Sequence, residues 1–350
     1  MGSIRALERA DLPAVIALLR ANLPGSPLDL EGLAAALEDP WHDDEIPSLV
    51  AIEGGEVVGF IRSQVRPMSF DGQPIRGVCL SDLVVSPGHR RGAPGAMLLG
   101  RCLKGPQELS WSDSATDLVV RAWRTFGGHV DHARSASFML VLRPWRWIGK
   151  IVAARAQGRA VRRSVMPVGA FPAHAVGPRL TGREPPGPEP GFSGADADAA
   201  AIAEALPAIS KRLRVAVDWD ESHLTGTFRQ IEALGGELVA RIVRRGDAPV
   251  GWYSYLRREG GVSRLLHLAA DERVAGAVFA DLVHDASAAD SAVLTGRAEP
   301  HLEQPLRERL AAVGFAWRPV IRARNPELAA AMATGSALLS RLDGELSRVH

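Results

Sequence analysis

The stretch that decides the fold covers residues 77–104 and reads GVCLSDLVVSPGHRRGAPGAMLLGRCLK. Its first part, residues 78–85, is apolar and β-branched enough to predict a half-buried strand. Pro87 and Gly88 end that strand. After the loop at residues 89–95, apolar residues recur at helical spacing. The stretch therefore predicts a strand, a glycine-rich loop and a helix in succession.

This succession predicts an anion site at the loop. The backbone N–H groups of the loop and of the first helical turn point to one place, and the helix dipole adds positive potential there. Arg90 and Arg91 lie in the loop and can donate charge-assisted hydrogen bonds to a phosphate. The loop is not a nucleotide P-loop, because it lacks the Gly-Lys-Ser/Thr end, and its glycines do not have the dinucleotide spacing.

The loop resembles the pyrophosphate loop of the GNAT superfamily of acyl-CoA-dependent N-acyltransferases. In that family a strand ending in Val-x-Pro is followed by Arg-x-x-Gly-x-Gly/Ala and then by a helix. The corresponding residues here are Val85, Ser86 and Pro87, followed by Arg90, Arg91, Gly92, Ala93, Pro94 and Gly95. The match departs from the family where Ala93 replaces the first glycine. An ordinary strand–turn–helix with a basic loop is the alternative when the loop is taken alone.

The order of the flanking elements favours the resemblance. Hydrophobic periodicity predicts β-α-α-β-β-β-α-β-α-β over residues 1–145, which is the GNAT order. A strand at residues 137–142 is expected to close this unit. Residues 122–128 read AWRTFGG, where the family commonly has Leu-Tyr-x-x-x-Gly-Phe. We therefore predict a GNAT-like acyl-CoA-binding domain at residues 1–145.

The rest of the chain predicts a linker and a second domain. Residues 146–191 combine a basic amphipathic segment with a Pro/Gly-rich linker. Residues 192–350 repeat the hairpin, strand, loop and helix, with a last helix expected at residues 326–342. The second loop carries Asp271 and Glu272 and no glycine, so it should repel a pyrophosphate. The predicted fold class is α/β (α+β), with two tandem GNAT-like domains, each a mixed, mostly antiparallel twisted sheet flanked by helices.

Composition excludes several other classes. With 46% hydrophobic and 23% charged residues the chain can build ordinary globular cores. No apolar signal region and no stretch of transmembrane length is present, so a cytoplasmic location is expected. Cys79 and Cys102 are too few for a disulfide framework or a structural zinc site, and no metal site is expected. Nucleic acid is not an expected partner, because the basic residues cluster in one segment without an aromatic platform.

The resemblance implies that the amine attacks the thioester directly within a ternary complex. Acetyl-CoA or a longer acyl-CoA would be the co-substrate. The strand would offer backbone groups to the pantetheine arm, and the loop would offer amides to the pyrophosphate. The cofactor-binding residues predicted in this way are Leu83, Val84, Val85, Arg90, Arg91, Gly92, Ala93, Gly95 and Ala96.

Asp82 is the predicted catalytic residue, which would orient or deprotonate the amine. A structural role, in which it caps a loop or pairs with an arginine, is the alternative. Trp123 occupies the position where the family usually has a tyrosine as general acid, and its indole N–H has no useful acidity. The tyrosines of the chain, Tyr253 and Tyr255, lie in the second domain. Water or another residue would then protonate the thiolate.

The acceptor pocket of GNAT folds is built around the segment that here contains residues 41–45. His42 and Asp43, together with Trp123, are the predicted substrate-binding residues. Their neighbouring acids would suit a cationic amine. A solvated acidic loop is the alternative.

Three functions remain open from the sequence. The first is N-acyl transfer to a small primary amine. The second is long-chain transfer to a lipid amine at a membrane, as in the GNAT-type bacterial ceramide synthases that acylate a sphingoid base. Residues 145–164 would then contact an anionic inner-membrane surface through tryptophans and arginines, unless the tryptophans pack between the domains. The third is a non-catalytic acyl-CoA-binding or regulatory module.

Overall fold

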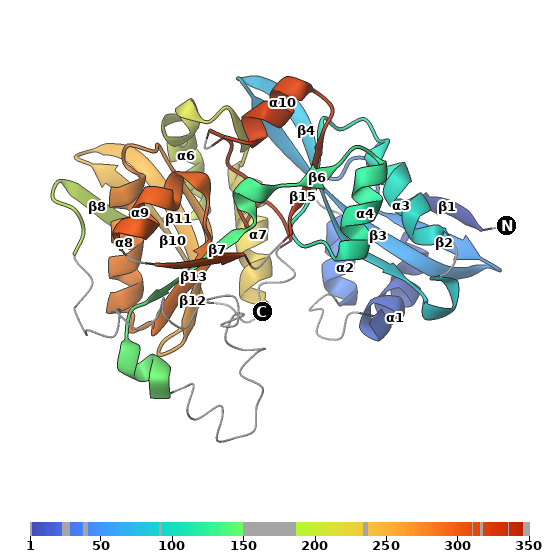
Figure 1. Ribbon diagram of the computed structural model, residues 1–350, viewed down its shortest axis with the longest axis horizontal. Helices are drawn as coiled ribbons and strands as arrows, with labels where there is room; N and C mark the ends of the chain where they lie inside the picture. The colour runs from blue at the N-terminus through green and yellow to red at the C-terminus, as the bar shows by residue number, and fades with distance from the viewer. Residues whose placement is uncertain are drawn as a thin grey trace.

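The computed structural model describes residues 2–22, 29–37, 41–90, 93–149, 187–233, 237–309, 311–315, 318–334 and 336–345. Two sheets lie side by side, each with helices packed on it (Figure 1). Both sheets are mixed and mostly antiparallel, and among the described strands each has one parallel pair. The predicted fold class, two tandem α/β units, is confirmed.

The first sheet has the strand order β1-β2-β3-β4-β5-β15-β6. These strands are β1 (Ser3–Ala6), β2 (Leu49–Glu53), β3 (Glu56–Phe70), β4 (Gln73–Val85), β5 (Leu109–Ser112), β15 (Val320–Ala323) and β6 (His129–Val130). A short strand, β9 (Val215–Val217), pairs with the far end of β3. The far end of the long β3–β4 hairpin, which belongs to the first half of the chain, therefore contacts a strand from the second half.

Helices cover both faces of the first sheet. The helices are α1 (Leu12–Asn22), α2 (Leu30–Leu37), α3 (Pro94–Leu103) and α4 (Asp117–Thr125). On one face Leu19 of α1 packs with Phe60 and Val84. On the other face Leu98 of α3 packs with Ile61 and Leu80 in a separate core cluster. Because β3 and β4 are covered on both sides, they carry apolar residues at successive positions instead of alternating ones.

The second sheet repeats this arrangement in the order β14-β7-β13-β12-β11-β10-β8. Its strands are β14 (Ala312–Phe315), β7 (Ala136–Val141), β13 (Val293–Arg297), β12 (Val262–Ala270), β11 (Ala248–Arg257), β10 (Glu237–Arg245) and β8 (Phe192–Asp196). Its helices are α6 (Ala199–Ile209), α7 (Glu221–Ala233), α8 (Ala275–Ala288) and α9 (Glu303–Glu308).

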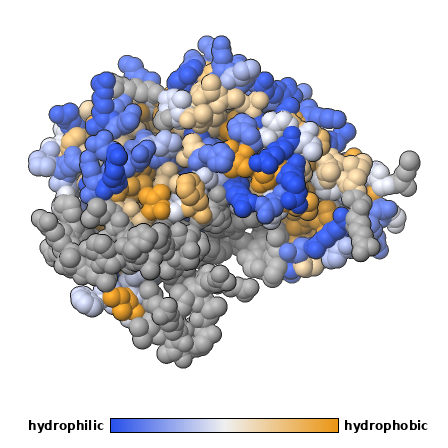
Figure 2. Space-filling view, viewed as in Figure 1, coloured by the Kyte–Doolittle hydropathy of each residue, from blue (hydrophilic) through white to orange (hydrophobic). Residues whose placement is uncertain are grey.

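On the face of the molecule in Figure 2, hydrophilic residues surround small patches of apolar side chains.

The two units exchange one strand each, and this corrects the sequence interpretation. The strand expected at residues 137–142 is present as β7, but it does not close the first sheet. It lies between β13 and β14 of the second sheet, with Leu140 opposite Leu294. In return β15 lies between β5 and β6 of the first sheet, with Ile321 opposite Trp111. The apolar pattern of a strand specifies burial but not the sheet it joins, so the sequence did not reveal the exchange.

The expected helix at residues 326–342 is also shorter than predicted. Helix α10 covers Pro326–Met332. Beyond it, residues 336–345 (the tail) run between the two sheets as extended and turn structure. The Leu338 amide donates to Val215 O at 2.9 Å, and the Leu342 amide donates to Leu266 O at 3.2 Å. The apolar residues of the tail fit a helical period, but hydrogen bonds to both units hold them in another conformation.

The basic segment can be described only in part, because residues 150–164 lie outside the described residues. Trp147 is buried, with 2% of its surface exposed, whereas Trp145 is 74% exposed. Arg146 pairs with Asp290 at 2.6 Å. Contact of this segment with a membrane stays a prediction. Among the helices that are described, none combines the length and apolar character needed to cross a bilayer.

Candidate functional site

The site begins at a bulge in β4. Phe60 of β3 faces Val84, but Arg62 faces Ser81, so β4 has one residue more than β3 in this interval. The extra residue places Asp82 in the left-handed region, with φ of 52°. Asp tolerates this conformation better than most residues. The parallel pairing of β4 with β5 ends at Cys79 and Trp111, just before the bulge.

Beyond that last pair lies a cavity of about 620 Å³ (the β4–β5 cavity). It brings together eight of the residues predicted from the sequence: Asp82, Leu83, Val84, Val85, Arg90, Gly95, Ala96 and Trp123. Ala93 caps the start of α3 and lines a neighbouring hollow. Arg91 and Gly92 lie outside the described residues. Residues that are adjacent in the sequence motif thus share one cavity with α4, which comes later in the chain.

One end of the β4–β5 cavity is positively charged. Helix α3 begins at Pro94, and Gly95 lies in its first turn at the cavity wall. Arg90 is held beside it, because Nη2 donates to Asn22 Oδ1 at 2.5 Å and Nε to Val85 O at 3.3 Å. A Cβ added to Gly95 would lie 3.3 Å from Val85 Cγ2, so the helix start approaches β4 closely. A helix N-terminus beside a fixed arginine suits a phosphate group.

The lining of the same cavity also carries carboxylates. Asp82 is 3% exposed, and Ser81 Oγ donates to its Oδ2 at 3.2 Å. No described basic side chain pairs with Asp82, so the structural alternative of an arginine pair is not seen among the described residues. A second carboxylate, Glu345 of the tail, also lines the cavity.

Sequence reasoning missed Glu345. Its carboxylate accepts hydrogen bonds from Ser112 Oγ (2.7 Å), the Asp113 amide (3.1 Å) and Ser114 Oγ (2.9 Å). It therefore sits where β5 ends and diverges from β4. No motif surrounds Glu345 in the sequence. Only the path of the tail through the folded molecule brings it to this cavity.

Trp123 forms part of the cavity wall from α4 and is 1% exposed. It is too deeply packed to move easily, since Gly128 leaves space for its ring only by lacking a Cβ. The tyrosines are engaged in the second unit, where Tyr253 donates to Asp281 at 2.6 Å and Tyr255 to Asp285 at 2.5 Å. Burial raises the pKa of both hydroxyls, so neither is a ready acid.

His42 and Asp43 are not brought to the β4–β5 cavity. Asp43 Oδ2 lies 3.3 Å from Arg76 Nη1, and His42 Nε2 lies 3.3 Å from Asp44 Oδ1. The preceding Trp41 stacks on His223 of the second unit, with ring centroids 3.6 Å apart. The acidic loop thus forms a contact between the units, and a substrate-binding role for His42 and Asp43 stays a prediction.

The matching place in the second sheet is filled by the chain itself. The parallel pairing of β12 with β13 ends at Arg264 and Thr295. Beyond it, His267 Nδ1 lies 2.7 Å from Ser340 Oγ, and Arg297 Nη1 donates to Leu339 O at 2.9 Å. The tail therefore occupies the position that is open in the first unit.

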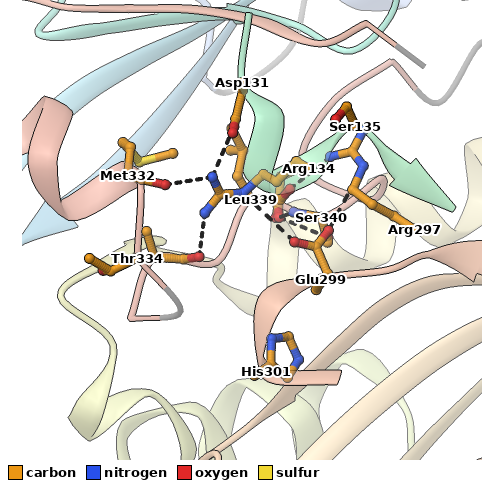
Figure 3. A network of polar contacts seen from close by, with 12 residues as sticks. Asp131, Arg134, Ser135, Arg297, Glu299, His301, Met332, Thr334, Leu339 and Ser340 are labelled. Carbon is orange, nitrogen blue, oxygen red and sulfur yellow. Dashed lines mark hydrogen bonds and ion pairs between the residues drawn. The ribbon is translucent and has the colours of Figure 1, made fainter. Parts of the chain in front are cut away.

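A buried ionic network anchors the tail between the units (Figure 3). Arg134, which is 0% exposed, donates to Asp131 at 2.9 Å and to the carbonyls of Met332 and Ala337. Glu299 lies 3.7 Å from Arg134 Nε and 3.9 Å from Arg297 Nε. Burial raises the pKa of Glu299 to about 7, although both arginines oppose this shift.

Within the described residues, no group of three or more His, Cys, Asp or Glu side chains is arranged to hold a metal ion. Both cysteines are free and buried, and burial raises the pKa of the Cys102 thiol to about 12.

No family model and no curated protein matches the sequence. Solved structures do resemble it. A GCN5-related N-acetyltransferase from Kribbella flavida has a TM-score of 0.56 and 15% identity, covering 92% of this chain and 71% of that one. A protein of unknown function from Enterococcus faecalis V583, described as a probable N-acyltransferase, has a TM-score of 0.60 and 10% identity, covering 92% and 73%. A GCN5-related N-acetyltransferase from Anabaena variabilis ATCC 29413 has a TM-score of 0.59 and 12% identity, covering 93% and 73%. At these identities the likeness is one of fold.

Proposed function

Because the chain carries the GNAT fold in two tandem copies, we propose that it is an acyl-CoA-dependent N-acyltransferase. The first unit binds the acyl-CoA, and the acyl group passes from the thioester to a primary amine by direct attack in a ternary complex. The names of two structural neighbours, GCN5-related N-acetyltransferases, support this reaction class.

The observation that carries the proposal is that the β4–β5 cavity contains both a phosphate-binding arrangement and a carboxylate. Arg90 and the start of α3 lie at one end, and Asp82 lies in the same cavity. The pyrophosphate of acyl-CoA would bind at the helix start, and the pantetheine arm would run along Leu83 to Val85. This arrangement takes the thioester toward Asp82, the side chain available to remove a proton.

The chemical step follows from these positions. Asp82 accepts a proton from the incoming ammonium group, which frees the nitrogen lone pair. The nitrogen forms a bond to the thioester carbonyl carbon, and the carbon–sulfur bond breaks with its electron pair passing to sulfur. The second amine proton passes to solvent water as the amide forms, and solvent returns a proton to the thiolate to give free CoA thiol. Trp123 supplies no acid for this step.

A lipid amine or a long acyl chain is the second candidate. The cavity lining includes the apolar side chains of Ile61, Leu80, Leu99, Leu118 and Val119. Leu118 is 69% exposed and would cover an apolar chain that leaves the cavity. These residues favour an apolar substituent on one of the two substrates. Membrane attachment through Trp145 remains part of this candidate only.

Titration with acyl-CoAs of increasing chain length tests the proposal. Binding measured by calorimetry, followed by release of free thiol in the presence of primary amines, should identify both the acyl chain and the activity. Binding without any turnover would leave the non-catalytic module as the function. Absence of binding at millimolar concentration for every chain length would contradict the proposal.

Gly95→Asp supplies the matched variant. The new side chain enters the helix start, where Val85 leaves only 3.3 Å for a Cβ, and adds negative charge beside the pyrophosphate. We expect acyl-CoA affinity to fall at least about a hundredfold, since two or more charge-assisted hydrogen bonds are lost. Asp271→Ala in the loop of the second unit should leave the affinity unchanged.

A further inference from the structure

Helix α4 separates the β4–β5 cavity from a second cavity of about 560 Å³ (the arginine cavity). Four residues of α4 line each cavity, and the two sets lie on different faces of the helix. Leu118, Val119, Ala122 and Trp123 line the β4–β5 cavity. The described lining of the arginine cavity consists of Asp117, Val120, Arg121, Arg124, Val130, His132, Ser135, Phe315 and Arg318. The two cavities share no described lining residue.

The described lining of the arginine cavity is positively charged. Arg121 and Arg124 lie three residues apart on α4, so their side chains are neighbours on one face of the helix. Arg318 adds a third guanidinium group from the segment between β14 and β15. Asp117 is the one acidic residue of this described lining, so three arginines meet one carboxylate, a net charge of +2. An anionic ligand would fit this charge.

The strand exchange takes away the local partner of Arg121. Asp117 lies four residues before Arg121 on α4, a spacing at which an acid and an arginine commonly pair. In this structure the Asp117 carboxylate pairs with Arg318 instead. Within the part of the chain that the structure describes, neither Arg121 nor Arg124 forms an ion pair or a side-chain hydrogen bond. Both guanidinium groups can therefore donate to a ligand.

The backbone that carries Arg318 is fixed to the first unit. The Ala115 amide donates to Arg318 O at 3.0 Å, just before α4 begins. The Asp131 amide donates to Pro319 O at 2.8 Å, just after β6. Elements of both units thus form the arginine cavity before any ligand binds, which lowers the entropic cost of binding.

Part of the wall of the arginine cavity is apolar. Phe315 is the last residue of β14 and is 78% exposed, although phenylalanine is usually a buried residue. Val120 and Val130 line the same cavity. A flat apolar group on a ligand would cover the Phe315 ring and gain the energy of an aromatic contact. The cavity therefore combines basic groups with an aromatic surface.

We propose that the arginine cavity binds a phosphate monoester that carries a flat apolar group. A phosphate monoester has a charge of about −1.5 to −2 at pH 7, and its oxygens accept paired hydrogen bonds from guanidinium groups. Arg121 and Arg124 bind the phosphate, and Phe315 packs against the apolar group. This site goes beyond the proposed function, because it lies on the other side of α4 from the acyl-transfer cavity.

Phenyl phosphate is the probe for this site, and inorganic phosphate is the comparison. Binding of each to the full-length protein is measured by NMR titration at pH 7.5. The native protein should bind phenyl phosphate more tightly. Arg121→Gln/Arg124→Gln should weaken phenyl phosphate binding by about tenfold or more, because charge-assisted hydrogen bonds are lost. Phe315→Ala should lower the affinity for phenyl phosphate to that for inorganic phosphate.

Two further variants show whether binding is local to the arginine cavity. Arg229→Gln/Arg307→Gln removes the same charge from exposed positions on α7 and α9 and should leave binding unchanged. Gly95→Asp alters the phosphate end of the β4–β5 cavity and should also leave it unchanged. Loss of phenyl phosphate binding in either variant would overturn the proposal, since the probe would then bind by net charge alone or at the start of α3.

Acetyl-CoA titration separates this site from the proposed function. Arg121→Gln/Arg124→Gln should bind acetyl-CoA with native affinity. If phenyl phosphate binds through the two arginines and no acyl-CoA binds, the proposed function fails and the arginine cavity stands. If acetyl-CoA binds and phenyl phosphate does not, the function stands and the arginine cavity fails.

Vesicles that contain phosphatidic acid distinguish a lipid headgroup from a soluble phosphate ester. Sedimentation of the native protein with these vesicles, lost in Arg121→Gln/Arg124→Gln, would identify the monoester as a lipid. Phenyl phosphate binding without sedimentation would identify it as a soluble molecule. The proposal fails if the native protein binds neither, or if replacing both arginines changes neither interaction.

Discussion

Asp82 combines a strained backbone with a buried carboxylate in a cavity. A residue other than glycine at φ of 52° costs conformational energy, which the bulge of β4 must offset. Asparagine keeps the shape and tolerates the same backbone region, so Asp82→Asn isolates the carboxylate. We expect kcat to fall about a hundredfold, as for loss of a general base, with acyl-CoA affinity unchanged.

Asp71 provides the control for this substitution. It also has positive φ, at 49°, but it lies in the exposed turn of the β3–β4 hairpin, paired with Arg214. Asp71→Asn should therefore leave kcat unchanged. Native turnover in Asp82→Asn across the pH range would make Asp82 a structural residue of the bulge.

Buried titratable groups near the tail predict the acid stability of the protein. Burial lowers the pKa of His267 and of His301 to about 4, below their usual 6.5, so unfolding takes up protons at these sites between pH 6.5 and 4. Their contribution to stability is present above pH 6.5 and is lost as the pH falls. Glu299 acts in the opposite sense. With a pKa of about 7 in the folded state against 4.5, it contributes stability that is present below pH 4.5 and lost as the pH rises through 7.

Glu299→Gln removes the proton that the folded state takes up at Glu299 as the pH falls. This uptake partly offsets the protons that the unfolded state takes up at His267 and His301. The variant should lose stability more steeply than the native protein between pH 6.5 and 4.5, by on the order of a few kcal/mol over that window. Urea unfolding at half-unit pH intervals measures the slope. Parallel slopes for the two proteins would mean that Glu299 remains ionised in the folded state.

At the scale of elements, the exchange of β7 and β15 predicts which sheet responds to a core substitution. Phe138 of β7 is fully buried and meets Phe279 of α8 edge-on, with centroids 5.6 Å apart. Phe138→Ala should cost about 3–5 kcal/mol. Although Phe138 belongs to the first half of the chain, hydrogen exchange should rise in β13 and α8 of the second unit.

Ile321 of β15 is the reciprocal position. It is 3% exposed and lies opposite Trp111 of β5. Ile321→Ala should cost about 2–5 kcal/mol and should raise exchange in β5 and β6 of the first sheet. Increased exchange confined to each residue's own half of the chain would contradict the exchanged strands.

The sequence predicts where the helices and strands lie better than it predicts which strands pair with one another. Periodicity predicted a strand at residues 78–85, which lies within β4 and ends with it at Val85, and a helix after the loop, which is α3, because burial of one face or both faces fixes the pattern. It did not assign β7 to the second sheet, since an apolar strand such as residues 136–141 fits either sheet equally well. The helix expected through residue 342 ends at Met332 because contacts far away in the chain, such as Leu338 with Val215, prevail over local periodicity.

The residues of the candidate site also differ in how far the sequence predicts them. Asp82, Arg90 and Gly95 lie within one motif, and the strand–loop–helix geometry alone brings them together. Trp123 was predicted to lie at the same site from the order of the elements in the first unit. Glu345 has no local signal, because its place depends on the path of the tail across both sheets.

At the scale of the molecule, neither half should fold without the other. Residues 1–149 alone would lack β15 between β5 and β6, and residues 187–350 alone would lack β7 between β13 and β14. Each fragment expressed singly should show no cooperative thermal transition by circular dichroism. Coexpressed, the fragments should copurify as a folded complex, because the exchange joins them by strand pairing. A cooperative transition in residues 1–149 alone would show that the first unit is independent and would support a domain boundary at residue 145.

The exchanged strands also constrain the order of events during synthesis on the ribosome. When β6 has emerged, the first sheet still has an open position beside β5, and this position stays open until β15 has been translated. The contacts that close it are distant in the chain; Arg322 reaches the carbonyl of Phe126 across 196 positions. Such pairings form slowly and leave apolar strand edges exposed in the nascent chain. We therefore expect chaperones to bind the unpaired edge of β5 while the ribosome translates the second unit.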